Sequence, residues 1–239
     1  MIPAYSYELV CRELAHAFGQ RSRALCREHV RMTGLLFARP SSPLAKDEII
    51  PSIEYYHHRS GDRIDFFCSG YGAYWEGLRE EFPDQVIVAP GKDPDWLFSA
   101  QKFNAFRAEI ESMTMWKYSG GVDLLLANAI YDSAHQTASI DFSSLICCQL
   151  DRMKQDGAIQ SVETFFERVF QFADAQSGND PTWGFSGKQE LRVAGSALKR
   201  VVLSLLPRKL GDDAARAFHF AVVDVSRSAQ HGDGPADCH

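Results

Sequence analysis

Apolar residues between Met32 and Gly72 follow a strand pattern, then a helix pattern, then a strand pattern again. Residues 35–37 form a short apolar run that stops at a cluster of turn formers, as a β-strand does at its end. Apolar side chains then recur at helical spacing from Ile49 to Tyr56, and residues 64–68 form a second apolar run. This stretch predicts a β-α-β unit, whose strands normally pair in parallel with a right-handed crossover.

The same two periodicities predict the elements of the remaining chain. Apolar runs predict strands at residues 85–89, 122–127 and 138–142, and the last two are close enough to form an antiparallel hairpin. Helical spacing predicts helices within residues 5–31, 73–82, 96–115, 162–172 and 190–206. Residues 212–227 fit either a helix or a strand.

This order of elements predicts an α/β protein with a mixed sheet, in the order β-α-β-α-β-β-α, flanked by N- and C-terminal helices. The expected organisation is a helical segment at residues 1–31, an α/β core at 32–180 and a helical extension at 181–227. Residues 228–239 are rich in Gly, Asp, Pro and His and predict a disordered tail.

In the order of its elements, the chain resembles the thioredoxin fold over residues 32–174. That family carries redox cysteines after its first strand and a cis-proline before its third. At these places the chain has Ser-Ser-Pro-Leu-Ala-Lys (residues 41–46) and Tyr-Ser-Gly-Gly (residues 118–121). The resemblance therefore implies the scaffold without its thiol chemistry, since a fold does not carry its function with it.

A Rossmann-like, doubly wound variant is the other topology that the pattern allows. Ser69-Gly70-Tyr71-Gly72 follows a strand and precedes a predicted helix, where glycines would let backbone amides approach a phosphate. The third glycine of the dinucleotide pattern is missing, and no phosphate-binding G-x-x-x-x-G-K-[ST] motif occurs in the sequence. An ordinary tight turn is the alternative interpretation.

Charge and composition narrow the class of function. A net charge of -6 argues against broad nucleic-acid binding, because phosphate neutralisation needs an excess of Lys and Arg. The sequence has no apolar run long enough for a membrane helix, and a cytoplasmic location is expected. The six cysteines have neither C-x-x-C spacing nor Cys/His pairing, which leaves zinc and redox motifs without support.

Two loops carry the candidate binding residues. If the strands of the β-α-β unit are parallel, both loops lie at the carboxyl edge of the sheet, where open α/β sheets usually bind ligands. The candidates offer cations, hydroxyls, backbone amides and one stacking ring, which suit a phosphate or carboxylate: Arg39, Ser41, Ser42 and Lys46 in the first loop, and Ser69, Gly70, Tyr71 and Gly72 in the second. The alternative is structural: Arg39 pairs with an acid and the serines cap the helix.

Three aspartates raise a second function. Asp65, Asp123 and Asp141 each stand between apolar neighbours, and clustered carboxylates could hold Mg²⁺ for a metal-dependent hydrolase acting on nucleotides or nucleic acid. The alternative is that Asp65 and Asp123 are solvated residues near the starts of their strands.

A third function is that of a structural subunit. Arginines recur through the N-terminal helical segment of this acidic protein, at positions 12, 21, 23, 27 and 31, and could join an acidic partner protein or simply form a solvated face. The leading hypothesis is a non-redox binding or regulatory module that recognises an anionic small molecule or a partner protein. The sequence assigns no cofactor and does not decide whether the protein is an enzyme.

Overall fold

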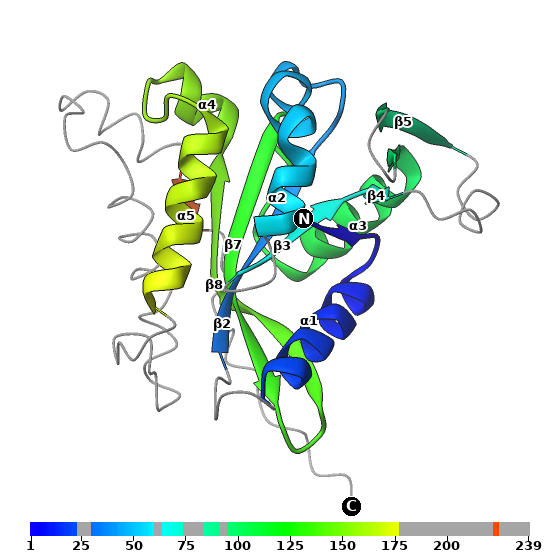
Figure 1. Cartoon of the computed structure of the whole chain (residues 1–239), viewed down its shortest axis with the longest axis vertical. Coiled ribbons are helices and arrows are strands. Elements are labelled where there is room, and N and C mark those ends of the chain that lie inside the picture. The colour runs from blue at the N-terminus through cyan, green and yellow to red at the C-terminus, as the bar shows by residue number, and fades with distance from the viewer. Residues whose placement is uncertain (23–29, 60–63, 74–83, 91–94, 177–221, 225–239) are drawn as a thin grey trace, which may run out of the picture.

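The structure is a computed structural model that describes residues 1–22, 30–59, 64–73, 84–90, 95–176 and 222–224. Over these ranges the protein is mixed α/β, with a six-stranded sheet, a three-stranded sheet and several helices (Figure 1). None of the helices in this part of the chain is long and apolar enough to cross a membrane.

The predicted β-α-β unit is present. Strands β2 (Val30–Ala38) and β3 (Asp65–Ser69) pair in parallel, with Leu36 opposite Cys68. The crossover between them is irregular: a π-helical turn (Ala45–Ile49) and a 3₁₀ turn (Ile50–Ser52) precede α2 (Ile53–Arg59). Pro51 lies in the 3₁₀ turn, and because proline has no N–H it cannot continue a regular ladder of helical hydrogen bonds.

The six-stranded sheet has the order β1-β3-β2-β7-β8-β9. Strand β1 (Ile2–Ala4) is parallel to β3, whereas β7 (Val122–Asp132), β8 (Thr137–Gln149) and β9 (Val222–Asp224) each run antiparallel to the strand before them. The predicted hairpin is therefore confirmed, with longer strands than expected. Strand β9 shows that residues 222–224 of the ambiguous segment are extended.

The three-stranded sheet has the order β4-β6-β5 and consists of β4 (Tyr71–Ala73), β6 (Trp96–Ser99) and β5 (Gln85–Ala89). Helix α3 (Ala100–Met113) follows β6 directly. Two predictions were wrong here: residues 96–99 form a strand instead of the start of a helix, and Ala73 is a strand residue. The helix begins at Ala100 because the Ser99 hydroxyl accepts a hydrogen bond from the Lys102 amide at 3.1 Å.

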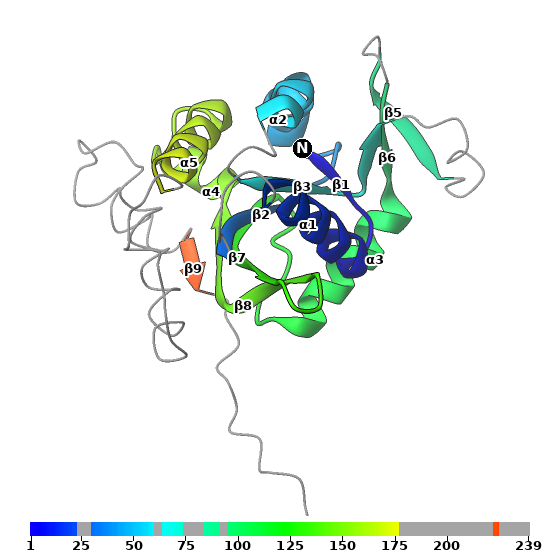
Figure 2. The same cartoon turned by 60° about the horizontal axis from the view of Figure 1, so that its bottom comes forward.

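Helices cover both faces of the large sheet. Helices α2 and α5 (Val162–Gln176) lie on one face, and α1 (Tyr7–Ser22) and α3 lie on the other (Figure 2). Ring contacts mark the two faces: Phe66 of β3 lies 5.2 Å from Phe166 of α5, and Phe37 of β2 lies 5.5 Å from Phe106 of α3. The short helix α4 (Leu150–Gln155) continues from β8.

The two ends of the chain depart from the predicted organisation. Residue Arg31 was expected in the N-terminal helical segment, but it is a buried residue of β2, where the neighbouring strand β3 supplies its partner Asp65. A short strand, β1, also precedes α1. The predicted helix at 190–206 and the predicted tail at 228–239 lie outside the described residues.

Candidate functional site

Both candidate loops lie at one edge of the large sheet. The parallel register of β2 and β3 brings their carboxyl ends together, so that Arg39 and Ser69 leave the sheet at the same edge. We call residues 39–46 the first edge loop and residues 69–72 the second edge loop. Their proximity follows from the parallel β-α-β unit, as expected from the sequence.

A phenylalanine from α3 lies between the two loops. The guanidinium carbon of Arg39 is 5.1 Å from the centre of the Phe103 ring. On the other side, a Cβ atom placed on Gly70 would lie only 2.7 Å from Phe103 Cβ. Phe103 therefore occupies the space between the two loops, where the sequence suggested a shared crevice.

In the first edge loop, Arg39 does not pair with an acid of the described residues, and Ser42 does not cap the helical turn. Arg39 Nη2 donates to the amide oxygen of Asn104 at 2.6 Å, and no carboxylate of the described residues pairs with it. The Ser42 amide donates to the Arg39 carbonyl at 2.9 Å, forming a tight turn, while Ser41 and Lys46 are exposed. The Ser42 hydroxyl makes no capping hydrogen bond.

Two polar atoms of this loop are buried without a hydrogen-bond partner: Arg39 Nε and Ser42 Oγ. Leaving a buried donor or acceptor unsatisfied costs about 1–3 kcal/mol, so such atoms are usually bonded to protein or water. A hydroxyl and a guanidinium three residues apart, both with free capacity, can together bind an oxyanion.

The second edge loop is buried. Ser69 is 1% exposed and Tyr71 is 0% exposed, with the Tyr71 ring 5.0 Å from that of Phe98. Tyr71 is therefore a core ring that cannot stack on a ligand, in contrast to the role expected of it, and burial raises the pKa of its hydroxyl well above the ordinary value. The Oγ of Ser69 and the hydroxyl of Tyr71 also lack hydrogen-bond partners.

The glycines of the second edge loop serve local packing. Gly70 has a φ of 76°, donates its N–H to the Ala4 carbonyl and accepts from the Ser99 amide. The side-chain position of Gly72 faces the Tyr5 hydroxyl, and β4 follows where a helix was expected. Residues 71–73 are extended, so within the described residues no helix begins at these glycines to support the phosphate interpretation. The rest of the predicted helix, residues 74–82, lies outside the described residues.

The three aspartates are not brought together. Asp123 lies opposite Phe37 of β2, and Asp65 lies opposite Thr33 of the same strand. Because Thr33 and Phe37 are four residues apart, the two aspartates are separated by about 13 Å along the strand direction. Asp141 lies on β8, separated from Asp65 by two intervening strands, or about 14 Å. Within the described part of the chain, no group of three or more His, Cys, Asp or Glu side chains could hold a metal ion.

Two of these aspartates are buried, although solvated positions were the expected alternative. Asp65 is 1% exposed and pairs with Arg31. Asp123 accepts hydrogen bonds from Trp116 Nε1, the Ser119 amide and the Ser119 hydroxyl, at 3.0, 2.9 and 2.6 Å. Burial raises its pKa, and the bonds from Ser119 and Trp116 only partly offset that effect. Asp123 thus fixes the connection between α3 and β7.

The cysteines described in the core are poor nucleophiles. Cys68, Cys147 and Cys148 are buried free thiols, and burial raises the pKa of each above its ordinary value. The thiolate is the reactive form of cysteine, so these groups stay protonated and unreactive at neutral pH.

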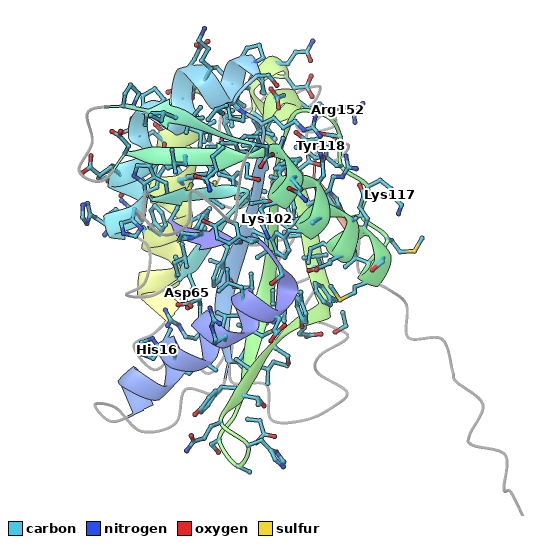
Figure 3. The ribbon with its side chains drawn as sticks, turned by 90° about the vertical axis from the view of Figure 1, so that its right-hand side faces the viewer. His16, Asp65, Lys102, Lys117, Tyr118 and Arg152 are labelled. Atoms are coloured by element: carbon cyan, nitrogen blue, oxygen red, sulfur yellow. The ribbon has the colours of Figure 1, made fainter. Side chains whose placement is uncertain are left out.

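The sequence did not indicate which residues contact Arg39. Phe103 and Asn104 of α3 contact it, as does Tyr118 from the connection that follows α3, and Arg107 of α3 lies over the Tyr118 ring. Figure 3 shows Tyr118 near Arg152 at one end of the molecule, with Asp65 well away from both. Nothing in the sequence pattern linked α3 to the first edge loop, because their contact joins residues 65 positions apart.

Comparison with known proteins identifies no relative of this chain. No protein-family model matches the chain, and searches of the curated proteins and of the solved structures likewise find no match. The site must therefore be interpreted from its own geometry.

Proposed function

We propose that the protein is a non-redox binding or regulatory module that recognises an anionic group of a small molecule or a partner protein through the first edge loop. Arg39 supplies the principal cation, Ser42 supplies a hydroxyl, and the exposed Ser41 and Lys46 flank them. Arginine suits this role because its planar fork of N–H donors matches carboxylate and phosphate oxygens. The second edge loop packs against Phe103, the ring on which Arg39 rests.

One observation carries the proposal: Arg39 Nε and Ser42 Oγ are buried without a hydrogen-bond partner, and Arg39 has no carboxylate partner among the described residues. An oxyanion offers the acceptors that both groups lack. The hydrolase and subunit alternatives have no comparable support, since the aspartates lie apart and Arg31 is buried.

We also propose that the large sheet has a thioredoxin-like topology. The elements β2, α2, β3, α3, β7, β8 and α5 follow the order on which the thioredoxin-like interpretation rests, with β4, β5, β6 and α4 as additions to it. A sheet in which β7 runs antiparallel to β2 supports that interpretation over a doubly wound one, whose strands are mostly parallel. The buried, protonated cysteines support a non-redox role, and a cytoplasmic location remains our expectation.

The proposal is tested by titrating inorganic phosphate, as the simplest oxyanion, into the full-length protein at constant ionic strength. Binding is followed by calorimetry for the wild type, Arg39→Gln and Arg12→Gln. Arg12 is the matched control because its side chain is 73% exposed and lies on α1. We expect Arg39→Gln to weaken binding about tenfold or more and Arg12→Gln to leave it unchanged. Equal affinities for all three proteins would refute the proposal.

A further inference from the structure

Arg39 is one of two arginines that rest on a pair of packed aromatic rings. The guanidinium carbon of Arg39 lies 5.1 Å from the centre of Phe103, and that of Arg107 lies 6.0 Å from the centre of Tyr118. The two rings themselves pack edge to face, with 5.4 Å between their centres. The aromatic pair thus contacts two guanidinium groups, one on each ring.

Asn104 links Arg39 to the helix that carries Arg107. Its side-chain oxygen accepts from Arg39 Nη2 at 2.6 Å, so the Arg39 guanidinium lies at Asn104. Asn104 and Arg107 are three residues apart on α3, which places them on the same face of the helix with about 5–6 Å between their Cβ atoms. Both arginines are thereby tied to neighbouring positions of α3.

Neither guanidinium is saturated by the acids around it. Arg107 Nε is buried without a hydrogen-bond partner, and its ion pair with Oε1 of Glu111 is long, at 3.9 Å. That same oxygen accepts a hydrogen bond from the Tyr118 amide at 3.0 Å. Like Arg39 Nε, Arg107 Nε is therefore a hydrogen-bond donor without an acceptor.

The remaining acids near Tyr118 are engaged elsewhere. Asp123 is buried and accepts from Trp116 and Ser119, and Asp151 accepts from the Val122 amide. These carboxylates stabilise the connection between α3 and β7, so they do not neutralise either arginine by a direct contact. A ligand with acceptors at the right spacing would supply what both guanidinium groups lack.

We infer that Arg107 is a second anion-contacting residue, and that the ligand is a small molecule carrying two linked anionic groups, such as a diphosphate. This inference rests on the proposed function, because it assumes that Arg39 binds the first group. Two guanidinium groups that lie over a pair of contacting rings can each take one phosphate of a diphosphate, whereas a single phosphate needs only the first edge loop. Arg107 thereby sets the preference for the longer ligand.

The test compares pyrophosphate with inorganic phosphate on the full-length protein, for the wild type, Arg39→Gln, Arg107→Gln and Arg12→Gln. We expect the wild type to prefer pyrophosphate, and Arg107→Gln to weaken pyrophosphate about tenfold while leaving phosphate within twofold. Arg39→Gln should weaken both anions, and Arg12→Gln neither. Arg107→Lys, which keeps the charge and the aromatic contact, should recover part of the pyrophosphate affinity; circular dichroism melts confirm that each variant is folded.

Three results would overturn the inference in distinguishable ways. If Arg107→Gln leaves pyrophosphate binding unchanged while Arg39→Gln weakens both anions, the second contact is wrong and the proposed function stands. If Arg107→Gln weakens both anions equally, Arg107 does not select the ligand, and the inference also fails. If the wild type binds neither anion, or Arg39→Gln changes nothing, both the inference and the proposed function are wrong.

Discussion

Arg31 and Asp65 form an ion pair inside the protein, with Arg31 Nη1 3.3 Å from Asp65 Oδ2 and side chains only 4% and 1% exposed. The two residues come from the adjacent parallel strands β2 and β3. The Arg31 guanidinium also lies 5.8 Å from the centre of the Phe18 ring of α1, so the pair is covered by that helix. The ion pair thus links β2 and β3 to α1.

Removing one charge of this pair should be costly. Asp65→Asn leaves the Arg31 cation buried without its counter-charge, and we expect the free energy of unfolding to fall by about 3–5 kcal/mol. Urea unfolding followed by circular dichroism measures the change. The double variant Arg31→Met with Asp65→Leu should lose much less, because an apolar pair carries no desolvation penalty. Equal losses in the single and double variants would contradict a direct pairing.

Gly70 should tolerate no side chain. Its φ of 76° disfavours any L-residue, and a Cβ would lie 2.7 Å from Phe103 Cβ and 2.9 Å from the Ser99 carbonyl oxygen. Gly120 is the matched control, because its φ is 91° but nothing lies within 4 Å of the added atom. We expect Gly120→Ala to cost about 1–2 kcal/mol from the backbone alone.

Gly70→Ala should cost clearly more than this control, since it adds a collision with backbone and Cβ atoms that cannot move aside. Urea unfolding of the two variants separates the effects of backbone conformation and collision. Equal losses for the two variants would show that Phe103 yields at no cost, and that the packing between the loops is loose.

The elements that the sequence predicted well are those with a strong local period. The strands at residues 35–37 and 64–68 are short apolar runs bounded by turn formers, and the stripe of α5 recurs at a spacing of 3.6 over one continuous segment. Their pairing also follows from sequence distance, because a crossover helix makes the first pair parallel and a short loop makes β7 and β8 antiparallel. The local pattern was thus sufficient to predict β2, β3, β7 and β8 and how they pair.

The beginning of α3 could not be predicted in the same way. Leu97 and Phe98 fit the helical stripe that continues into Phe103 and Phe106, and only pairing with β4 and β5 makes them extended. The same limit applies to the site: the carboxyl edge and Arg39 were predictable, but Phe103 and Asn104 reach that edge through contacts between distant segments. Periodicity contains no information about such contacts.

Glu167 joins α5 to α2 and should make stability depend on pH. Its carboxylate accepts from the Tyr55 hydroxyl at 2.6 Å and from Arg59 Nε and Nη2 at 3.2 Å each. Partial burial acts to raise the pKa of Glu167, but the hydrogen bonds from Arg59 and Tyr55 outweigh it and hold the pKa below the ordinary 4.5. The folded protein therefore releases this proton more readily than the unfolded chain.

The sign of the pH effect follows from that lowered pKa. Above pH 4.5 the carboxylate is charged in both states and its contacts contribute fully; as pH falls through the folded-state pKa, the contribution is lost. Glu167→Gln should thus unfold at lower urea concentration than the wild type at neutral pH, and the difference should shrink towards zero in strongly acidic buffer. All other titrating groups are common to both proteins and cancel in the comparison. A difference that stays constant over this range would mean that packing of the side chain, and not its charge, joins α5 to α2.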